Sequence, residues 1–194
     1  MNNINNSIWL KPSKSPFTKK EKIKLAIWLL IQNSLFRIIP HKLNFFRIKI
    51  LRIFGGKIKN NCFIHPSATI YMPWNLEMDE FSSIDFDSII YSLDKVKIGK
   101  FVSISYKSNI NTGSHDISDP EFKLITKPVI INDGAFIGTE VYISPGVIIG
   151  EMTVIGARSV VTKNMPNNMI CVGNPCKAIK ERIKKENIDE RNFY

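Results

Sequence analysis

Residues 131–161 read INDGAF-IGTEVY-ISPGVI-IGEMTV-IGARSV-V, a run of five hexapeptides. Every sixth residue of this run is a branched aliphatic: Ile131, Ile137, Ile143, Ile149, Ile155 and Val161. A short or β-branched residue follows four positions after each of the first five: Ala135, Val141, Val147, Thr153 and Ser159. A period of six is neither the two of a strand nor the 3.6 of a helix. It predicts a solenoid whose coils each consist of three hexapeptides, with the aliphatic side chains stacked inside.

The same spacing continues upstream in three blocks: Ile58, Ile64 and Ile70; Met78, Ile84 and Ile90; Ile98, Ile104 and Ile110. Pro73-Trp74-Asn75 and Ser92 to Val96 shift the phase, and segment 111–130 breaks it. We therefore expect a mainly β chain with a parallel β-helix domain over 58–165, from which 111–130 projects as a loop. A β-sandwich of short strands is the alternative, but such strands do not hold one period across separate blocks.

The composition of the 194 residues suits one domain with accessory ends. No stretch reaches the roughly 18 uninterrupted apolar residues of a membrane span, and the polar first residues do not read as a signal peptide. Three cysteines, Cys62, Cys171 and Cys176, are too few for a disulfide framework, and Cys62 occupies a core position. Cytoplasmic residence is the default expectation.

The positive charge is concentrated at the N-terminal end. Residues 1–60 hold 13 Lys or Arg and one acid, Glu21, whereas residues 61–194 hold 14 basic and 16 acidic residues. We assign 1–57 to a basic, aromatic arm with helices over 20–39 and 42–53, because Pro40 and Gly55-Gly56 end them. Apolar residues recur at helical spacing on one side of the first helix: Ile23, Ile27, Leu30, Ile31, Leu35 and Ile38.

Two interpretations of this arm stay open. It can cap the first coil, whose edge would otherwise be unpaired. It can also contact a membrane surface, because tryptophan, phenylalanine and many cations suit anionic lipid headgroups. No recognition motif accompanies the charge, so we expect no nucleic acid partner. At the other end, segment 166–194 is expected to hold an extended stretch over 170–176 and a short basic helix over 177–188.

Four further motifs accompany the hexapeptides: Pro73-Trp74-Asn75, Gly113-Ser114-His115-Asp116, the segment 156–163 (GARSVVTK) and Gly173-Asn174-Pro175. Together they resemble the hexapeptide-repeat acyltransferases, and among these the colanic-acid-type O-acetyltransferases of polysaccharide biosynthesis. The resemblance covers nearly all of the chain after about residue 20. It implies a left-handed β-helix, a homotrimer and acetyl-CoA as the acyl donor. The left hand is taken from the resemblance, since most parallel crossovers are right-handed.

Acetyl transfer to a hydroxyl needs a base, and histidine is suited to this role near neutral pH. Of the three histidines, His41 lies in the arm, His65 follows a core residue, and His115 opens the long loop. The resemblance makes His115 the general base. A carbonyl or a carboxylate is expected to orient its other ring nitrogen. Asp85 and Asp116 are candidate acceptor-binding residues, although a solvated Asp85 is an equal alternative.

The resemblance also implies which residues bind acetyl-CoA. Its extended arm is expected in a groove, with its phosphates near cations past the solenoid; these residues are Phe136, Thr139, Ala157, Thr162, Lys163, Lys177 and Lys180. Lysine offers a point charge where relatives often have arginine, which weakens that part of the comparison. The lysines also read as ordinary surface charge. The loop 111–130 can be a tolerated surface insertion, but its position at His115 favours a lid over the acceptor.

The resulting functional hypothesis is acetyl-CoA-dependent O-acetylation of a saccharide, and the basic, aromatic arm leads to the narrower hypothesis that this saccharide is linked to a membrane lipid carrier. N-acetylation of an amino sugar nucleotide is the enzymatic alternative, because an amine uses the same base. A carbonic anhydrase of the γ class needs three converging histidines, which this spacing does not favour, so no metal is expected. A non-catalytic structural solenoid is the alternative from another class.

Overall fold

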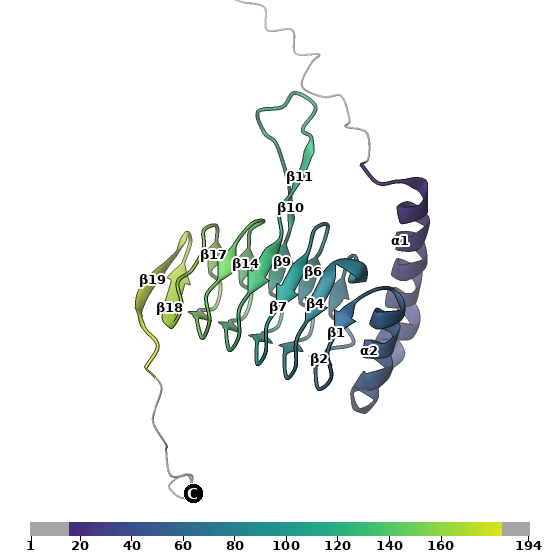
Figure 1. The fold of residues 1–194 in the computed structure, drawn as a ribbon, viewed down its shortest axis with the longest axis horizontal. Helices are drawn as coiled ribbons and strands as arrows, with labels where there is room; N and C mark the ends of the chain where they lie inside the picture. The colour runs from purple at the N-terminus through teal and green to yellow at the C-terminus, as the bar shows by residue number, and fades with distance from the viewer. Residues whose placement is uncertain (1–15, 184–194) are drawn as a thin grey trace, which may run out of the picture.

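The computed structural model describes residues 16–183, as a helical arm followed by a three-sided β-helix whose coils stack along the long axis (Figure 1). Three mainly parallel sheets, here called faces A, B and C, form its sides. Face A contains β1 (Lys57–Ile58), β4 (Leu76–Met78), β7 (Val96–Ile98), β12 (Val129–Ile131) and β15 (Ile148–Ile149). Face B contains β2 (Phe63–Ile64), β5 (Ser83–Ile84), β8 (Ser103–Ile104), β13 (Phe136–Ile137), β16 (Val154–Ile155), β18 (Met169–Gly173) and β19 (Cys176–Glu181). Face C contains β3 (Thr69–Ile70), β6 (Ile89–Tyr91), β9 (Asn109–Asn111), β14 (Tyr142–Ile143) and β17 (Val160–Val161).

The aliphatic series forms the core, as its period predicts. Every member from Ile58 to Val161 is at most 3% exposed. Polar residues at the short positions are buried as well, and their hydroxyls hydrogen-bond to the backbone of the next coil. For example, Ser82 Oγ donates to the Gly99 carbonyl at 2.6 Å and Ser108 Oγ to the Gly138 carbonyl at 2.8 Å.

The predicted loop lies between β9 and β12 and contains a hairpin of β10 (Gly113–His115) and β11 (Leu124–Thr126). This hairpin projects from the middle of the stack, at the corner where face C turns into face A (Figure 1). We call this the C/A corner. An earlier phase shift occurs at the same corner, where η3 (Pro73–Asn75) forms a short 3₁₀ turn.

The arm contains the two predicted helices. The first begins with α1 (Lys19–Ile31), which is N-capped by a capping box of Thr18 and Glu21, and continues as a π-helical segment, η1 (Gln32–Phe36). The second combines η2 (His41–Leu43) with α2 (Asn44–Ile53).

Side chains of the arm satisfy the open edge of the first coil. Trp28 Nε1 donates to the Ile70 carbonyl at 2.6 Å, and Gln32 Oε1 accepts from the Ile70 N–H at 2.6 Å. Arg47 Nε donates to the Ile64 carbonyl at 3.0 Å. These backbone groups have no preceding coil to pair with, so the arm is a cap and that interpretation is confirmed.

The apolar side of α1 singled out in the sequence is not the side that contacts the solenoid. Most of its members face outward, with Ile23 61%, Leu30 72% and Ile38 74% exposed, and only Ile31 packs against the core, whereas Trp28 and Phe36 on the opposite side are fully buried. The helix is apolar on both sides, so its period indicates a helix but does not identify the packed face.

The predicted basic helix over 177–188 is wrong for the residues that the structure describes, and residues 184–188 lie outside them. Here β19 forms an antiparallel hairpin with β18, which itself pairs with β16. The chain reverses at Gly173, whose φ is +107°, and at Pro175. The edge of face B supplies backbone partners, and these outweigh the helix propensity of a lysine-rich segment.

Candidate active site

Three of the predicted acceptor and cofactor residues, Asp85, Thr139 and Ala157, are brought into one row at the corner between faces B and C, here called the B/C corner. Strand register aligns the core residues that precede this corner in four successive coils: Ile84, Ile104, Ile137 and Ile155. The two residues that follow each are therefore stacked as well: Asp85-Phe86, Ser105-Tyr106, Gly138-Thr139 and Gly156-Ala157. Residues separated by 18 to 33 positions thus become neighbours because each coil adds one layer.

The part of this row in the later coils, which contains Thr139 and Ala157 and is here called the upper part, presents free hydrogen-bond donors. Within residues 16–183, the backbone N–H groups of Thr139 and Ala157 form no hydrogen bond, whereas the Thr139 carbonyl accepts from Arg158 N–H at 2.8 Å. Phe136 is on β13 of the adjoining face B and is 39% exposed. Such unpaired amides beside an exposed ring can bind the amides and methylenes of an extended ligand.

The part of the row in the earlier coils, which contains Asp85, Phe86 and Tyr106 and is here called the lower part, is aromatic and acidic. Phe86 and Tyr106 stack with ring centroids 4.7 Å apart and an interplanar angle of 2°. Asp85 Oδ1 accepts from the Phe86 N–H at 2.8 Å, which leaves its other oxygen available. The stacked pair was not singled out in the sequence, because only the coil register brings residues 86 and 106 together.

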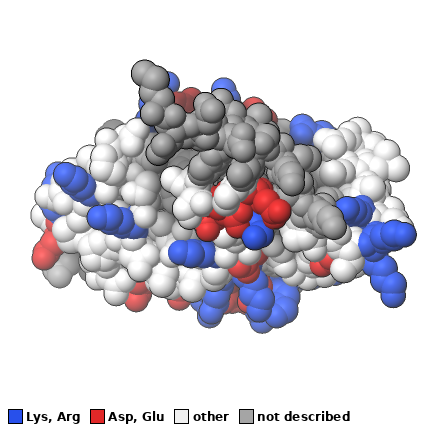
Figure 2. Space-filling view, turned by 90° about the horizontal axis from the view of Figure 1, so that it is seen from above, with Lys and Arg blue, Asp and Glu red and all other residues white. Residues whose placement is uncertain are grey.

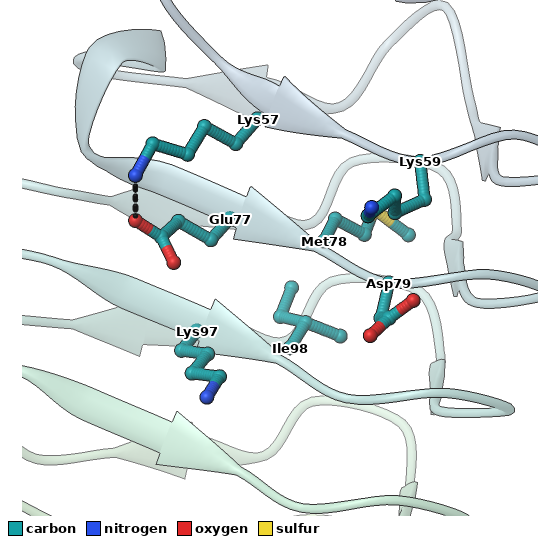
Figure 3. Close-up of a pocket in the computed structure, with 7 residues that line it drawn as sticks. All are labelled: Lys57, Lys59, Glu77, Met78, Asp79, Lys97 and Ile98. Atoms are coloured by element: carbon teal, nitrogen blue, oxygen red, sulfur yellow. Dashed lines mark hydrogen bonds and ion pairs between the residues drawn. The ribbon is translucent and has the colours of Figure 1, made fainter.

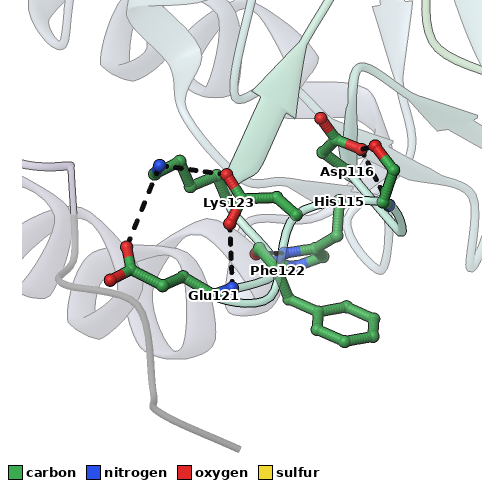
Figure 4. A network of polar contacts seen from close by, with 7 residues as sticks. His115, Asp116, Glu121, Phe122 and Lys123 are labelled. Atoms are coloured by element: carbon green, nitrogen blue, oxygen red, sulfur yellow. Dashed lines mark hydrogen bonds and ion pairs between the residues drawn. The ribbon is translucent and has the colours of Figure 1, made fainter. Parts of the chain in front are cut away.

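His115 is exposed on β10 of the hairpin at the C/A corner. Its Nδ1 lies 2.6 Å from the carbonyl oxygen of Phe122, across the hairpin (Figure 4). A carbonyl only accepts, so Nδ1 carries the proton and Nε2 keeps its lone pair. The backbone carbonyl is thus the orienting partner that the sequence left undecided.

Asp116 points away from this interaction. Its Oδ1 accepts from the backbone N–H of Ser118 at 2.9 Å and from the Ser118 hydroxyl (Figure 4). These hydrogen bonds lower the pKa of the Asp116 carboxyl. Lys123 pairs with Asp119 at 3.0 Å and braces the same hairpin. In this geometry Asp116 shapes the turn, and its contact with an acceptor stays a prediction.

The remaining predicted cofactor-binding residues lie at two other places. Thr162 and Lys163 follow β17 at the C/A corner, the corner that also carries His115. Lys177 and Lys180 lie on β19, opposite Val172 and Ile170 of β18, and both are exposed. One chain therefore divides the predicted site between its B/C corner, its C/A corner and the end of face B.

A shallow hollow of about 140 Å³ lies on face A (Figure 3). Lys57 Nζ bonds Glu77 Oε1 across it at 2.9 Å, which lowers the pKa of Glu77, and Lys97 continues the row in the next coil. None of the predicted site residues lines this hollow. We interpret it as an exposed charge ladder that joins adjacent coils, with a modest contribution to stability.

No protein-family model matches the sequence. The putative colanic acid biosynthesis acetyltransferase WcaF of Escherichia coli K12 is 39% identical over 164 residues, which cover 84% of this chain and 90% of WcaF. The chain belongs to the hexapeptide-repeat acetyltransferases. A maltose O-acetyltransferase from Clostridium difficile is 30% identical in sequence and superposes with a TM-score of 0.76 over 86% of this chain and 90% of its own.

A hexapeptide-repeat acetyltransferase of Vibrio cholerae, crystallised with acetyl-CoA, has a TM-score of 0.78 over 92% of this chain and 98% of its own at 20% identity. At that identity the likeness concerns the fold. The fold that these acetyltransferases share is the left-handed β-helix, so the predicted hand is confirmed. As a member of this family, the chain is an acyltransferase.

The histidines of this acetyltransferase do not converge. The rings of His41 and His65 lie 4.5 Å apart where the arm meets the first coil, and His115 lies on the hairpin. Among residues 16–183, no group of three or more His, Cys, Asp or Glu side chains could hold a metal ion. Nor is any helix in that range long and apolar enough to cross a membrane.

Proposed function

We propose that this acetyltransferase transfers the acetyl group of acetyl-CoA to a sugar hydroxyl during the biosynthesis of a surface polysaccharide, such as an exopolysaccharide, a capsule or an O-antigen. The observation that carries the proposal is the likeness to WcaF over nearly the whole chain. The maltose O-acetyltransferase supports it, since its acceptor is also a saccharide by name.

His115 is the proposed general base. Its Nδ1–H is held by the Phe122 carbonyl, so Nε2 is the free nitrogen. Nε2 takes the proton of the acceptor hydroxyl as that oxygen attacks the thioester carbonyl carbon. When the carbon–sulfur bond breaks, the imidazolium returns the proton to the leaving thiolate. The imidazolium keeps its hydrogen bond to Phe122 throughout, so no ring flip is needed.

Acetyl-CoA is the proposed donor. We place its pantetheine arm along the upper B/C corner, where the N–H groups of Thr139 and Ala157 are free and the Phe136 ring is exposed. One of these N–H groups is suited to stabilise the oxygen that gains charge in the transition state. Lys177 and Lys180 extend this line beyond the last coil and supply charge for phosphates. Thr162 and Lys163 would add to it from the neighbouring subunit.

The division of the site between two corners supports a homotrimer. Neither His115 at the C/A corner nor Thr139 at the B/C corner completes a site within one chain. In a ring of three side-by-side solenoids, the hairpin of each subunit can meet the B/C corner of the next. Each of the three sites would then combine a base from one subunit with a donor groove from another.

The lower B/C corner is the proposed acceptor site. A flat aromatic pair beside a carboxylate suits a sugar, because rings contact its apolar face and the Asp85 carboxylate accepts hydroxyl hydrogen bonds. The basic, aromatic arm suits an anionic membrane surface, so we propose a lipid-linked acceptor. The protein would then act in the cytoplasm, at the inner face of the cell membrane.

The test is acetyl-CoA-dependent thiol release with a panel of sugars, nucleotide sugars and lipid-linked glycans. We expect release by the wild type, one added acetyl group by mass spectrometry, and a loss of about 10²-fold or more in kcat for His115→Ala. His41→Ala is the matched control and should keep full activity. Equal rates for His115→Ala and the wild type would refute the base. A product that survives mild alkali would be an amide and would indicate N-acetylation.

A further inference from the structure

The first helix of the arm has an apolar side that nothing in the described chain covers. The side facing the solenoid buries Trp28, Gln32 and Phe36 completely. The opposite side of α1 exposes three large aliphatic residues one turn apart, Ile23 61%, Ile27 50% and Leu30 72%, and Ile38, beyond the π-helical segment η1, is 74% exposed. We call these four residues the outer stripe. Apolar side chains that lie together on an exposed helix face often mark an interaction site, so the outer stripe calls for a partner.

The surroundings of the outer stripe are cationic. Lys19 and Lys20 begin the helix, and Arg37 lies beside its far end. The single acid, Glu21, is occupied, because its Oε2 accepts from the Thr18 N–H at 2.7 Å in the capping box. Figure 2 shows Lys and Arg side chains beside uncharged surface at the end of the molecule where the arm lies. An apolar stripe with a cationic rim is complementary to anionic headgroups over acyl chains.

The position of the helix fits a flat surface. In Figure 1, α1 runs across the end of the solenoid, on the side away from the coils. The B/C and C/A corners, which the proposed trimer uses, run along the length of the solenoid instead. Side-by-side association of three solenoids therefore leaves the arms free and places all three at the same end. Three stripes on one end provide a multivalent contact with a surface.

We propose that the outer stripe docks on an anionic lipid bilayer, with α1 lying in the interface plane. The aliphatic side chains would enter the boundary between headgroups and acyl chains, and the flanking cations would contact the phosphates. Docking itself depends only on the arm. Its purpose rests on the proposed function, since it would hold the active site next to a lipid-linked acceptor.

The test is flotation of the full-length protein with vesicles of phosphatidylcholine alone and with one quarter phosphatidylglycerol. We expect binding to the anionic vesicles, weak binding to the neutral ones, and release by high salt. The variant Ile27→Ser/Leu30→Ser should bind the anionic vesicles at least about tenfold more weakly, because two of the four anchors are lost. Phe81→Ser/Phe101→Ser is the matched control. It removes two similarly exposed apolar residues (52% and 63%), which precede β5 and β8 at the corner between faces A and B. This control should bind like the wild type.

Three outcomes would overturn docking. The wild type could fail to float with anionic vesicles, or the stripe variant could float as well as the control. Light scattering could also show that the stripe variant halves the mass of the particle, in which case the stripe joins two assemblies of this chain. Acetyl transfer to a water-soluble acceptor separates this proposal from the previous one. A wild type that is fully active but does not float refutes docking and leaves the proposed reaction intact. A wild type that floats but is inactive refutes the proposed reaction and leaves docking intact.

Discussion

Replacing Arg47 by methionine should detach part of the cap. The Arg47 side chain is completely buried in α2, and no acidic group pairs with it within residues 16–183. Burial lowers its pKa, since the charged form loses water. Its five hydrogen bonds run from 2.7 to 3.4 Å, to the carbonyls of Ile64, Ile39, Pro40 and His41 and to the side chain of Asn44. One cation thus ties the chain between the two helices to the first coil.

The expected loss in the free energy of unfolding follows from the carbonyl oxygens that are left without a hydrogen-bond donor. Methionine keeps the apolar stem but donates nothing. The buried Ile64 carbonyl would lose its partner at a cost of about 1–3 kcal/mol, and the carbonyls of Ile39 and Pro40, bonded at 2.7 and 3.1 Å, would add about 0.5–1 kcal/mol each. The variant no longer has to bury a positive charge, and the desolvation cost that it avoids offsets part of this loss. We expect a net loss of about 2–4 kcal/mol, which shifts Tm by on the order of 10 °C in a domain of this size.

The assay is urea and thermal denaturation at one fixed protein concentration, because assembly alters the apparent stability. Arg52→Met on the same helix is the control: Arg52 is exposed and its Nε donates to the Ile58 carbonyl at 2.7 Å, so we expect a loss of about 1 kcal/mol or less. A loss under about 1 kcal/mol for Arg47→Met, or equal losses for the two variants, would refute the reasoning.

Three further predictions concern the groove, the core and the cap. Gly138→Ala would place a Cβ 2.7 Å from the Ile155 carbonyl oxygen, so we expect a loss of about 1–3 kcal/mol by denaturation, whereas Ser105→Ala in the same row should change little. Burial raises the pKa of the Cys171 thiol from 9.0 to about 11, so it should resist Ellman's reagent at pH 8 until the protein unfolds. The unfolded thiol releases its proton first, so this group's contribution to stability should fall as pH rises from 9 to 11, with Cys171→Ala showing a smaller decline. Trp28→Phe removes the 2.6 Å hydrogen bond to the cap edge and should lower the free energy of unfolding by about 1–3 kcal/mol; no change would mean that water replaces it.

The coils could be predicted from the sequence because each layer repeats one local rule. An aliphatic residue every sixth position gives one inward side chain per face, and this holds without knowledge of distant contacts. The projecting loop was predicted for the same reason, since it interrupts the rule. His115 stood out because it is one of only three histidines and opens that loop.

The sequence by itself determined the solenoid, the two capping helices and the histidine of the hairpin, since all of these follow from spacing or composition. The tertiary structure decided which side of α1 is buried, because a helix that is apolar on both sides offers no contrast. It replaced the expected C-terminal helix with β19, because the open edge of face B supplies hydrogen bonds that no local propensity predicts. It also identified the partner of His115, since the Phe122 carbonyl is a backbone group that any residue would supply. The site residues lie on separate corners because the number of residues per coil, including the hairpin, sets where each one points.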